Sequence, residues 1–157
     1  MTYKPKSFRE KLADNKNFPK VVKIDEKMSK RWGTGTVVIP APKEVDAIMK
    51  RVPKGKLITI NQIREKVARK HGATIGCPIC CGIFARIAAG AADEKAKESK
   101  KSTTPYWRTL KERGEINPKY PGGISGQKKL LENEGHGVIQ KGKRYYVMDF
   151  KKYLVKT

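Results

Sequence analysis

The sequence predicts a mainly helical α+β fold, for three reasons. Two helices are expected in succession, over 59–71 and 78–92, and a short connection containing Gly72 joins them as in a helix-turn-helix. A β-hairpin is expected over 137–148, directly after a helix at 125–134, where a winged helix carries its wing. The length of 157 residues suits one domain with an extension. We therefore expect a winged helix-turn-helix-like domain with a C-terminal β-hairpin wing.

Residues 1–35 are expected to form a basic N-terminal arm that is partly ordered. The segment is rich in lysine and carries only scattered apolar residues. Val21–Ile24 could form a short strand, and Asp25 is a suitable N-cap for a brief helix through Met28. The arm either packs over the domain or contacts nucleic acid, and its residues leave both possibilities open.

The domain itself is expected over 36–157. Thr36–Ile39 is β-branched and is stopped by prolines, and Pro42 suits the first turn of a helix with apolar residues at helical spacing. Thr59, followed three residues later by Gln62, forms a capping box that opens the next helix. Gly72 is expected to end that helix.

The helix expected over 78–92 has two different faces. One face is an ordinary apolar stripe, whereas the other is built from small residues, which allow a helix backbone to approach another surface closely. Because the second helix of a helix-turn-helix docks on DNA, the small face is a candidate DNA contact; burial of both faces is the alternative. The stripe comprises Ile79, Ile83, Phe84, Ile87, Ala88 and Ala91, and the small face Gly82, Ala85, Ala89 and Ala92, with Arg86 close by.

The charge of the chain predicts a polyanionic partner. Lys and Arg number 36 against 15 Asp and Glu, for a net charge of +21. Neutralised phosphates release counterions, so nucleic acid is the expected partner, and charge alone favours neither DNA nor RNA. The sequence has no long apolar run and no signal-peptide centre, so we expect no membrane partner. We expect a cytoplasmic monomer, associated with the nucleoid if the cell is prokaryotic.

Two further basic segments are candidate phosphate contacts. Residues 94–104 read as a flexible basic loop, for which a merely solvated loop is the alternative. Lys141, Lys143 and Arg144 fall at or near the tip of the expected hairpin, where they would contact phosphates and position the protein without reading sequence.

The three cysteines, Cys77, Cys80 and Cys81, include a C-x-x-C spacing. Such a spacing fits half of a zinc site or a redox pair. No second pair of ligands in tandem spacing completes a zinc site, and a disulfide is uncommon in the cytosol, so we expect neither a metal nor a cofactor. The cysteines are interpreted as small apolar residues, with a reactive thiol as the alternative.

Residues 104–136 resemble the active-site segment of the O6-alkylguanine-DNA alkyltransferases, the methylated-DNA–protein-cysteine methyltransferases. In that family a Pro-Cys-His-Arg tetrapeptide precedes a Tyr-x-Gly-Gly turn and a helix that ends Leu-Leu-x-x-Glu-Gly. The matching residues here are Pro105, Tyr106, Trp107 and Arg108, then Tyr120, Gly122 and Gly123, and finally Glu134. The resemblance implies a vestigial base pocket lined by Tyr106, Trp107, Tyr120, Gly122, Gly123 and Glu134.

The resemblance also implies that no methyl group is transferred. In the family the cysteine loses its proton through the histidine and a water to the glutamate, and the thiolate attacks the alkyl group. Here Tyr106 replaces the cysteine and Trp107 the histidine, and a phenol of pKa about 10 is mostly un-ionised at neutral pH. The chain is most similar to the alkyltransferase-like proteins, which flag lesions for repair. Those proteins usually keep the histidine and an arginine finger, and this chain keeps neither.

Residues 79–86 resemble the Arg-Ala-Val-Gly-x-Ala-x-Arg motif of the family's recognition helix, which lies in the minor groove. Gly82 matches the glycine, Arg86 matches the second arginine, and Ile79 falls on the arginine finger. The predicted DNA contacts are therefore Ile79, Gly82, Ala85, Arg86, Ala89 and Arg108, together with Lys141, Lys143 and Arg144 of the hairpin.

These observations predict a non-enzymatic protein that binds duplex DNA, senses alkylated guanine or assists DNA repair, and has repair proteins as possible further partners. One alternative is a general DNA- or RNA-binding protein without lesion preference. A second is a methyltransferase that uses a relocated cysteine, and a third is a protein-interaction module whose charge confers solubility.

Overall fold

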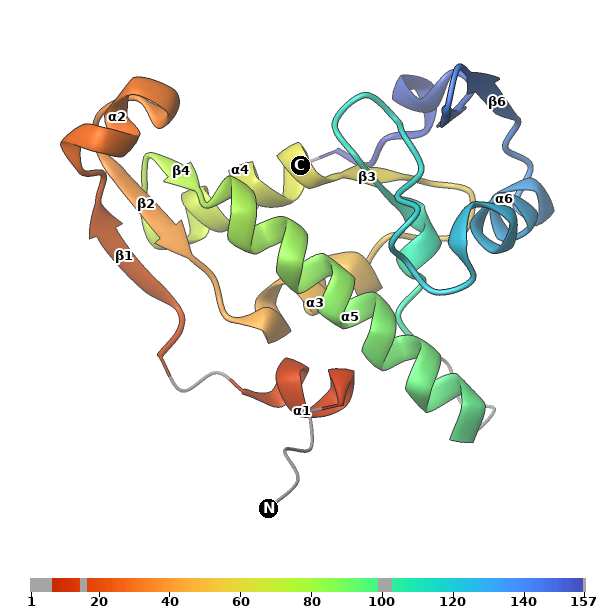
Figure 1. Ribbon diagram of the computed structural model, residues 1–157, viewed down its shortest axis with the longest axis horizontal. Helices are drawn as coiled ribbons and strands as arrows, with labels where there is room; N and C mark the ends of the chain where they lie inside the picture. The colour runs from red at the N-terminus through yellow and green to blue at the C-terminus, as the bar shows by residue number, and fades with distance from the viewer. Residues whose placement is uncertain (1–6, 15–16, 99–102, 157) are drawn as a thin grey trace.

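The computed structural model describes residues 7–14, 17–98 and 103–156. Its longest element, α5, runs diagonally across the middle of the molecule (Figure 1). None of the described helices has the length and apolar character of a membrane span. The mainly helical α+β fold class is confirmed. The helices are α1 Phe8–Ala13, α2 Glu26–Trp32, α3 Pro42–Lys50, α4 Ile60–His71, α5 Pro78–Glu98 and α6 Gly123–Asn133, with 3-10 turns at Tyr106–Arg108 and Phe150–Tyr153.

The strands form three small sheets. In the first sheet, β2 pairs antiparallel with β1 and parallel with β4. The second sheet consists of β3 paired parallel with β5. The third is the predicted C-terminal hairpin, in which Lys141 pairs with Arg144 around Gly142 and Lys143. The hairpin is confirmed, and its role as a wing stays a prediction. The strands are β1 Lys20–Lys23, β2 Thr36–Ile39, β3 Ile58–Thr59, β4 Ile75–Gly76, β5 Thr109–Leu110, β6 Val138–Lys141 and β7 Arg144–Val147.

The described parts of the N-terminal arm dock onto the rest of the chain. Asp25 caps α2 as expected by accepting the backbone N–H of Met28 at 2.8 Å, although α2 then continues to Trp32. Helix α1 was not predicted, although Ser7 followed three residues later by Glu10 is an N-cap signal. It packs against α5, where the Phe8 backbone N–H donates to the Glu94 carboxylate at 2.6 Å. Residues 1–6 and 15–16 of the predicted arm lie outside the described residues.

Helix α4 has the predicted termini. The Thr59 hydroxyl accepts the Gln62 N–H at 3.3 Å, and the Gln62 side chain accepts the Thr59 N–H at 3.0 Å, which completes the capping box. Gly72 ends the helix with a φ of 64°, a left-handed conformation that glycine adopts without strain.

Helix α5 is longer than predicted. It was expected to end at residue 92 and instead continues to Glu98, so residues 94–98 of the predicted flexible loop are helical. Ion pairs stabilise the added turns. Lys97 Nζ lies 3.1 Å from Asp93 Oδ2 one turn earlier, and the Arg9 guanidinium of α1 pairs with the Glu98 carboxylate. Lys100 and Lys101, the other lysines of that loop, lie outside the described residues.

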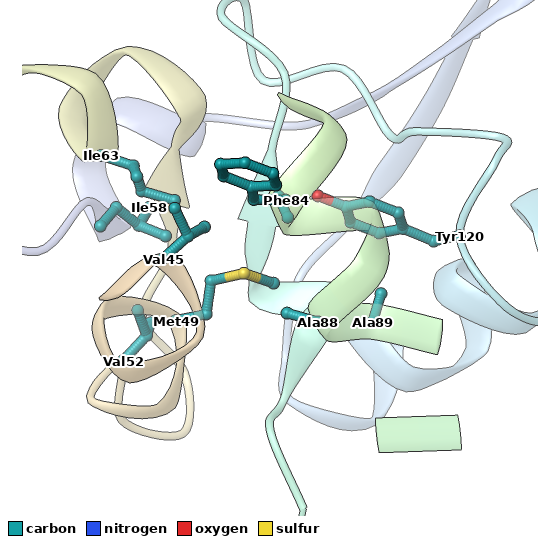
Figure 2. Packing of buried hydrophobic residues seen from close by; sticks show 10 residues of the cluster. Val45, Met49, Val52, Ile58, Ile63, Phe84, Ala88, Ala89 and Tyr120 are labelled. Atoms are coloured by element: carbon teal, nitrogen blue, oxygen red, sulfur yellow. The ribbon is translucent and has the colours of Figure 1, made fainter. Parts of the chain in front are cut away.

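The main core lies between α3, α4 and α5. Figure 2 shows Met49 of α3 reaching toward α5, beside Val45 and Phe84. Ala88 and Ala89 are fully buried in the same cluster, and their small size lets the α3 and α5 backbones come close together. The core therefore fixes which side of α5 faces inward, and with it which side faces solvent.

Candidate nucleic-acid interface

The outward face of α5 differs from the one predicted. Ile79 and Ile83, expected in the buried stripe, are 59% and 51% exposed. Ala85 and Ala89, expected to contact DNA, are both 0% exposed and pack in the core. The structure thus corrects the prediction for these two alanines, because their small size serves the approach of α5 to the protein's own core. An apolar periodicity alone did not distinguish the two sides of this alanine-rich helix.

A continuous strip of outward side chains runs along the first half of α5. Ile79, Gly82, Ile83 and Arg86 stand at positions i, i+3, i+4 and i+7, so they lie on one helix face; we call them the α5 strip. A Cβ added at Gly82 would meet no atom within 4 Å, so the protein's own packing does not require glycine there. Glycine inside a helix costs about 0.5–1 kcal/mol relative to alanine. The strip therefore carries a destabilising residue that no packing contact among the described residues explains.

The α5 strip forms one side of a shallow groove of about 280 Å³. Its other side is the segment after β5, with Lys111, Asn117, Pro118 and Lys119. The sequence reasoning missed this segment, although the Asn-Pro dipeptide is a turn signal between two lysines. Isoleucines flanked by cations on both sides of a groove suit a partner with apolar edges and a negatively charged backbone.

The tetrapeptide resembling the family's active site lies in the 3-10 turn Tyr106–Arg108, and it meets Glu134 as the resemblance implied. The Trp107 indole Nε1–H donates to the Glu134 carboxylate at 2.9 Å. Arg108 donates from Nε at 2.9 Å and from Nη2 at 2.7 Å, and the Gly55 backbone N–H donates at 3.3 Å. These contacts make Glu134 the centre of an internal hydrogen-bond network.

The environment of Glu134 keeps it ionised. Burial would raise the pKa of its carboxyl, but the hydrogen bonds from Arg108, Trp107 and Gly55 outweigh burial and hold the pKa below its usual value. An indole N–H only donates, so Trp107 has no lone pair with which to accept a proton. Trp107 therefore cannot relay a proton to Glu134 in the way the family's histidine does.

Arg108 belongs to this internal network. Its Nη1 donates to the Val52 carbonyl at 2.7 Å, so all three guanidinium nitrogens are hydrogen-bonded inside the protein. The structure thereby corrects the prediction that Arg108 contacts DNA, because its charge is matched by Glu134 and its side chain is largely covered.

Aromatic rings occupy the region of the predicted base pocket. The half-buried Tyr106 ring meets Trp107 and Tyr120 edge-on, with centroid distances of 5.4 and 6.1 Å. The Tyr106 hydroxyl lies 3.5 Å from the Pro121 carbonyl oxygen. Burial raises the pKa of both phenols, and Asp93 adds to the rise at Tyr106, so both stay protonated at neutral pH. Gly122 and Gly123 form the turn into α6 with φ values of 80° and 61°.

The remaining predicted contacts lie at the surface. Lys141, Lys143 and Arg144 are exposed at the end of the hairpin, and Lys141 Nζ lies 5.9 Å from the centre of the Tyr146 ring. Their contact with phosphate stays a prediction. The three cysteines are free thiols, and within the described ranges no three His, Cys, Asp or Glu side chains gather as metal ligands.

Comparison with known proteins gives a match in structure and none in sequence. No family model and no curated protein sequence matches the chain. The crystal structure of S. pombe Atl1 in complex with damaged DNA containing O6-carboxymethylguanine aligns with a TM-score of 0.51 and 22% identity, over 74% of this chain and 94% of that one. A crystal structure of S. pombe ATL in complex with DNA aligns with a TM-score of 0.47, at the same identity and coverage. The chain has the fold of an alkyltransferase-like protein.

Proposed function

We propose that the chain is a non-enzymatic, duplex DNA-binding protein of the alkyltransferase-like type that senses alkylated guanine. The observation that carries this proposal is the α5 strip, in which Ile79, Ile83 and Arg86 stand exposed around a glycine that no internal contact explains. Similarity in fold to a protein solved on alkylated DNA supports duplex DNA as the partner.

Charge supports the same partner. A net charge of +21 favours a polyanion, and the lysines across the groove from the strip are placed to reach phosphates while the isoleucines meet sugars or base edges. Lys141, Lys143 and Arg144 of the hairpin would add phosphate contacts that set the orientation of the protein.

The tetrapeptide region supports a role without catalysis. Methyl transfer to a side chain requires an activated nucleophile, and activation requires a base close to it. Tyr106 is a phenol whose pKa is raised by burial, and its neighbour Trp107 donates its only polar hydrogen to Glu134. The position of the family's acceptor thus holds a poor nucleophile, and the neighbouring Trp107 cannot accept a proton from it.

Fluorescence-anisotropy titration of matched duplexes, with and without one O6-methylguanine, tests the proposal. We expect binding to both at low salt, tighter binding to the modified duplex, and no methylated protein by intact mass after incubation. Failure to bind either duplex at low salt would contradict the proposed function.

The α5 strip is tested by reversing one charge. Arg86→Asp should weaken binding to every duplex, because it places a carboxylate against the phosphate backbone. Lys27→Asp is the matched control, since it makes the same charge change at an exposed lysine of α2, outside the α5 strip and its groove. Equal losses for the two variants would show that α5 does not face DNA through this strip.

A second candidate is a general nucleic-acid-binding protein without lesion preference. The packing of Tyr106 against Trp107 and Tyr120 favours it, because a filled pocket leaves less room for a flipped base. Equal affinity for modified and unmodified duplexes, or tighter binding to RNA, would select this candidate. Tyr106→Ala separates the two: it should weaken lesion preference only if the ring contacts the modified base.

A further inference from the structure

Two cysteines frame the start of α5 in an arrangement that DNA binding does not explain. Cys77 follows β4 and stands at the N-cap, Pro78 occupies the first helical position, and Cys80 lies in the first turn. The Cys80 backbone N–H donates to Cys77 Sγ at 3.3 Å. Both thiols are free. Cys77 Sγ therefore lies against the first turn of α5, within hydrogen-bonding distance of the backbone of the residue that carries the second thiol.

The surroundings activate one thiol of the pair. Hydrogen bonding from the Cys80 side chain, aided by the backbone N–H groups of Cys80 and Ile79 and by the nearby Arg64 cation, outweighs burial and lowers the pKa of Cys77 to about 6. Arg64 is held near this turn by a hydrogen bond from its Nε to the Gly76 carbonyl at 3.2 Å. Cys77 is thus the thiol of the pair that loses its proton more readily.

The other two thiols lack this activation. Hydrogen bonding to Cys77 and burial raise the pKa of Cys80, which stays protonated and half-buried. Burial raises the pKa of Cys81 to about 12, and this side chain is fully enclosed. A nucleophilic thiolate next to a protonated partner, at a strand-to-helix junction, is the arrangement of dithiol redox pairs.

We propose that Cys77 and Cys80 form a reversible dithiol–disulfide pair at the DNA-facing end of α5. With hydrogen peroxide as oxidant, the Cys77 thiolate attacks one peroxide oxygen, the O–O bond breaks, and the departing hydroxide takes a proton to become water. The Cys80 sulfur then attacks the resulting sulfenic acid, which releases a second water as the S–S bond forms. Two thiols are oxidised and one peroxide is reduced. Cys77 is only 4% exposed, so the site favours an oxidant as small as peroxide.

Oxidation of this pair would change the DNA-facing surface. Ile79 of the α5 strip lies between the two cysteines in the sequence, and disulfide formation removes the thiolate charge beside it. On the proposed function, losing a negative charge close to the phosphates should tighten DNA binding by roughly twofold to tenfold at low salt. This effect is separate from the oxidation itself, which needs no DNA.

The experiment oxidises the reduced full chain with hydrogen peroxide, stops the reaction with catalase and acid, and maps disulfides by mass spectrometry. We expect a Cys77–Cys80 bridge that dithiothreitol reverses. Cys77→Ser and Cys80→Ser should abolish the bridge, and Cys81→Ser should leave it unchanged. Serine at position 77 keeps an oxygen acceptor at the N-cap, so loss of the bridge there cannot be ascribed to loss of the helix.

Three outcomes would overturn the redox pair: no disulfide under excess peroxide, a bridge that involves Cys81, or only disulfides between molecules. Anisotropy of the oxidised and reduced protein on the same duplex then tests the link to DNA. Equal affinities would refute that link, whereas loss of all DNA binding in both forms would instead refute the proposed function.

Discussion

Glu134 is the residue at which three separate segments of the chain meet. By resemblance to the alkyltransferases, it stands where a glutamate receives the proton of the acceptor cysteine. Here its carboxylate accepts hydrogen bonds from Trp107, Arg108 and Gly55. These donors tie the tetrapeptide, the turn after α3 and the end of α6 together, so Glu134 stabilises the fold.

Glu134→Gln is expected to destabilise the protein by about 3 kcal/mol at pH 7, because it leaves the Arg108 cation without its partner in a largely buried place. Urea denaturation of both proteins measures the difference. The pKa of Glu134 is lower in the folded protein than its usual 4.5, so its contribution is present above about pH 4.5 and is lost as the pH falls through the folded value. The gap between the two proteins should therefore shrink below pH 4; a gap independent of pH would contradict this account.

His136 makes stability depend on pH in a second range, and here the folded protein favours the neutral form of the side chain. It is buried against the Tyr153 ring, and neither ring nitrogen has a hydrogen-bond partner among the described residues. Burial lowers its pKa from the usual 6.5, despite the nearby Glu134 charge. The unfolded chain then binds the proton more readily, so stability should fall as the pH drops through 6.5 and level off below the folded pKa. His136→Phe should remove this slope in denaturation measured between pH 7.5 and about 5; an unchanged slope would assign it to another group.

At the scale of elements, α5 combines two tasks in one helix. Its inward side uses alanines to approach α3, and its outward side exposes isoleucines and Arg86 at the groove. Two glycines on this helix meet different surroundings. A Cβ at Gly82 would reach empty space, whereas a Cβ at Gly90 would overlap the Phe8 ring of α1.

The two glycines give a matched pair of variants. Gly82→Ala should raise the free energy of unfolding by about 0.5–1 kcal/mol, because alanine is the better helix former and nothing obstructs its methyl group. The same substitution should weaken duplex binding by filling the approach to DNA. Gly90→Ala should lower stability, because Phe8 and α1 must move. Thermal unfolding and anisotropy on both variants measure these effects; a Gly82→Ala protein that is more stable and binds equally well would remove the glycine from the interface.

Local sequence signals predicted where helices and turns occur better than they predicted which side of a helix is buried. The capping box at Thr59 and the left-handed Gly72 depend on neighbouring residues only, so they were predictable, as was the hairpin turn at Gly142. The inward side of α5 depends on which elements pack against it, whereas α1 was missed although Ser7 and Glu10 supply a local N-cap signal. The resemblance brought Trp107 and Glu134 together correctly. The resemblance could not reveal that Arg108 takes part in the same hydrogen-bond network. Its third hydrogen bond goes to the Val52 carbonyl, and the position of that carbonyl depends on how the chain folds.

At the scale of the whole molecule, a charge of +21 raises the question of whether the amount of charge or its placement governs binding. The hairpin and α2 lie at opposite ends of the molecule (Figure 1). Each carries two exposed lysines, Lys141 and Lys143 on the hairpin and Lys27 and Lys30 on α2. Replacing either pair with glutamine lowers the net charge equally. The two double variants therefore have the same total charge and differ only in where it was removed.

If placement governs binding, the hairpin pair contacts phosphates and the α2 pair does not. The logarithm of the binding constant falls by about 0.9 per phosphate neutralised for each tenfold rise in salt. The slope of the double variant Lys141→Gln/Lys143→Gln should then be shallower than that of the parent by about 2, whereas Lys27→Gln/Lys30→Gln should keep the parent slope. Anisotropy titrations of one duplex over a series of salt concentrations measure both slopes. Equal changes of slope in the two variants would mean that DNA binding depends on the overall charge of the protein. The prediction that the hairpin is a DNA-contacting wing would then be wrong.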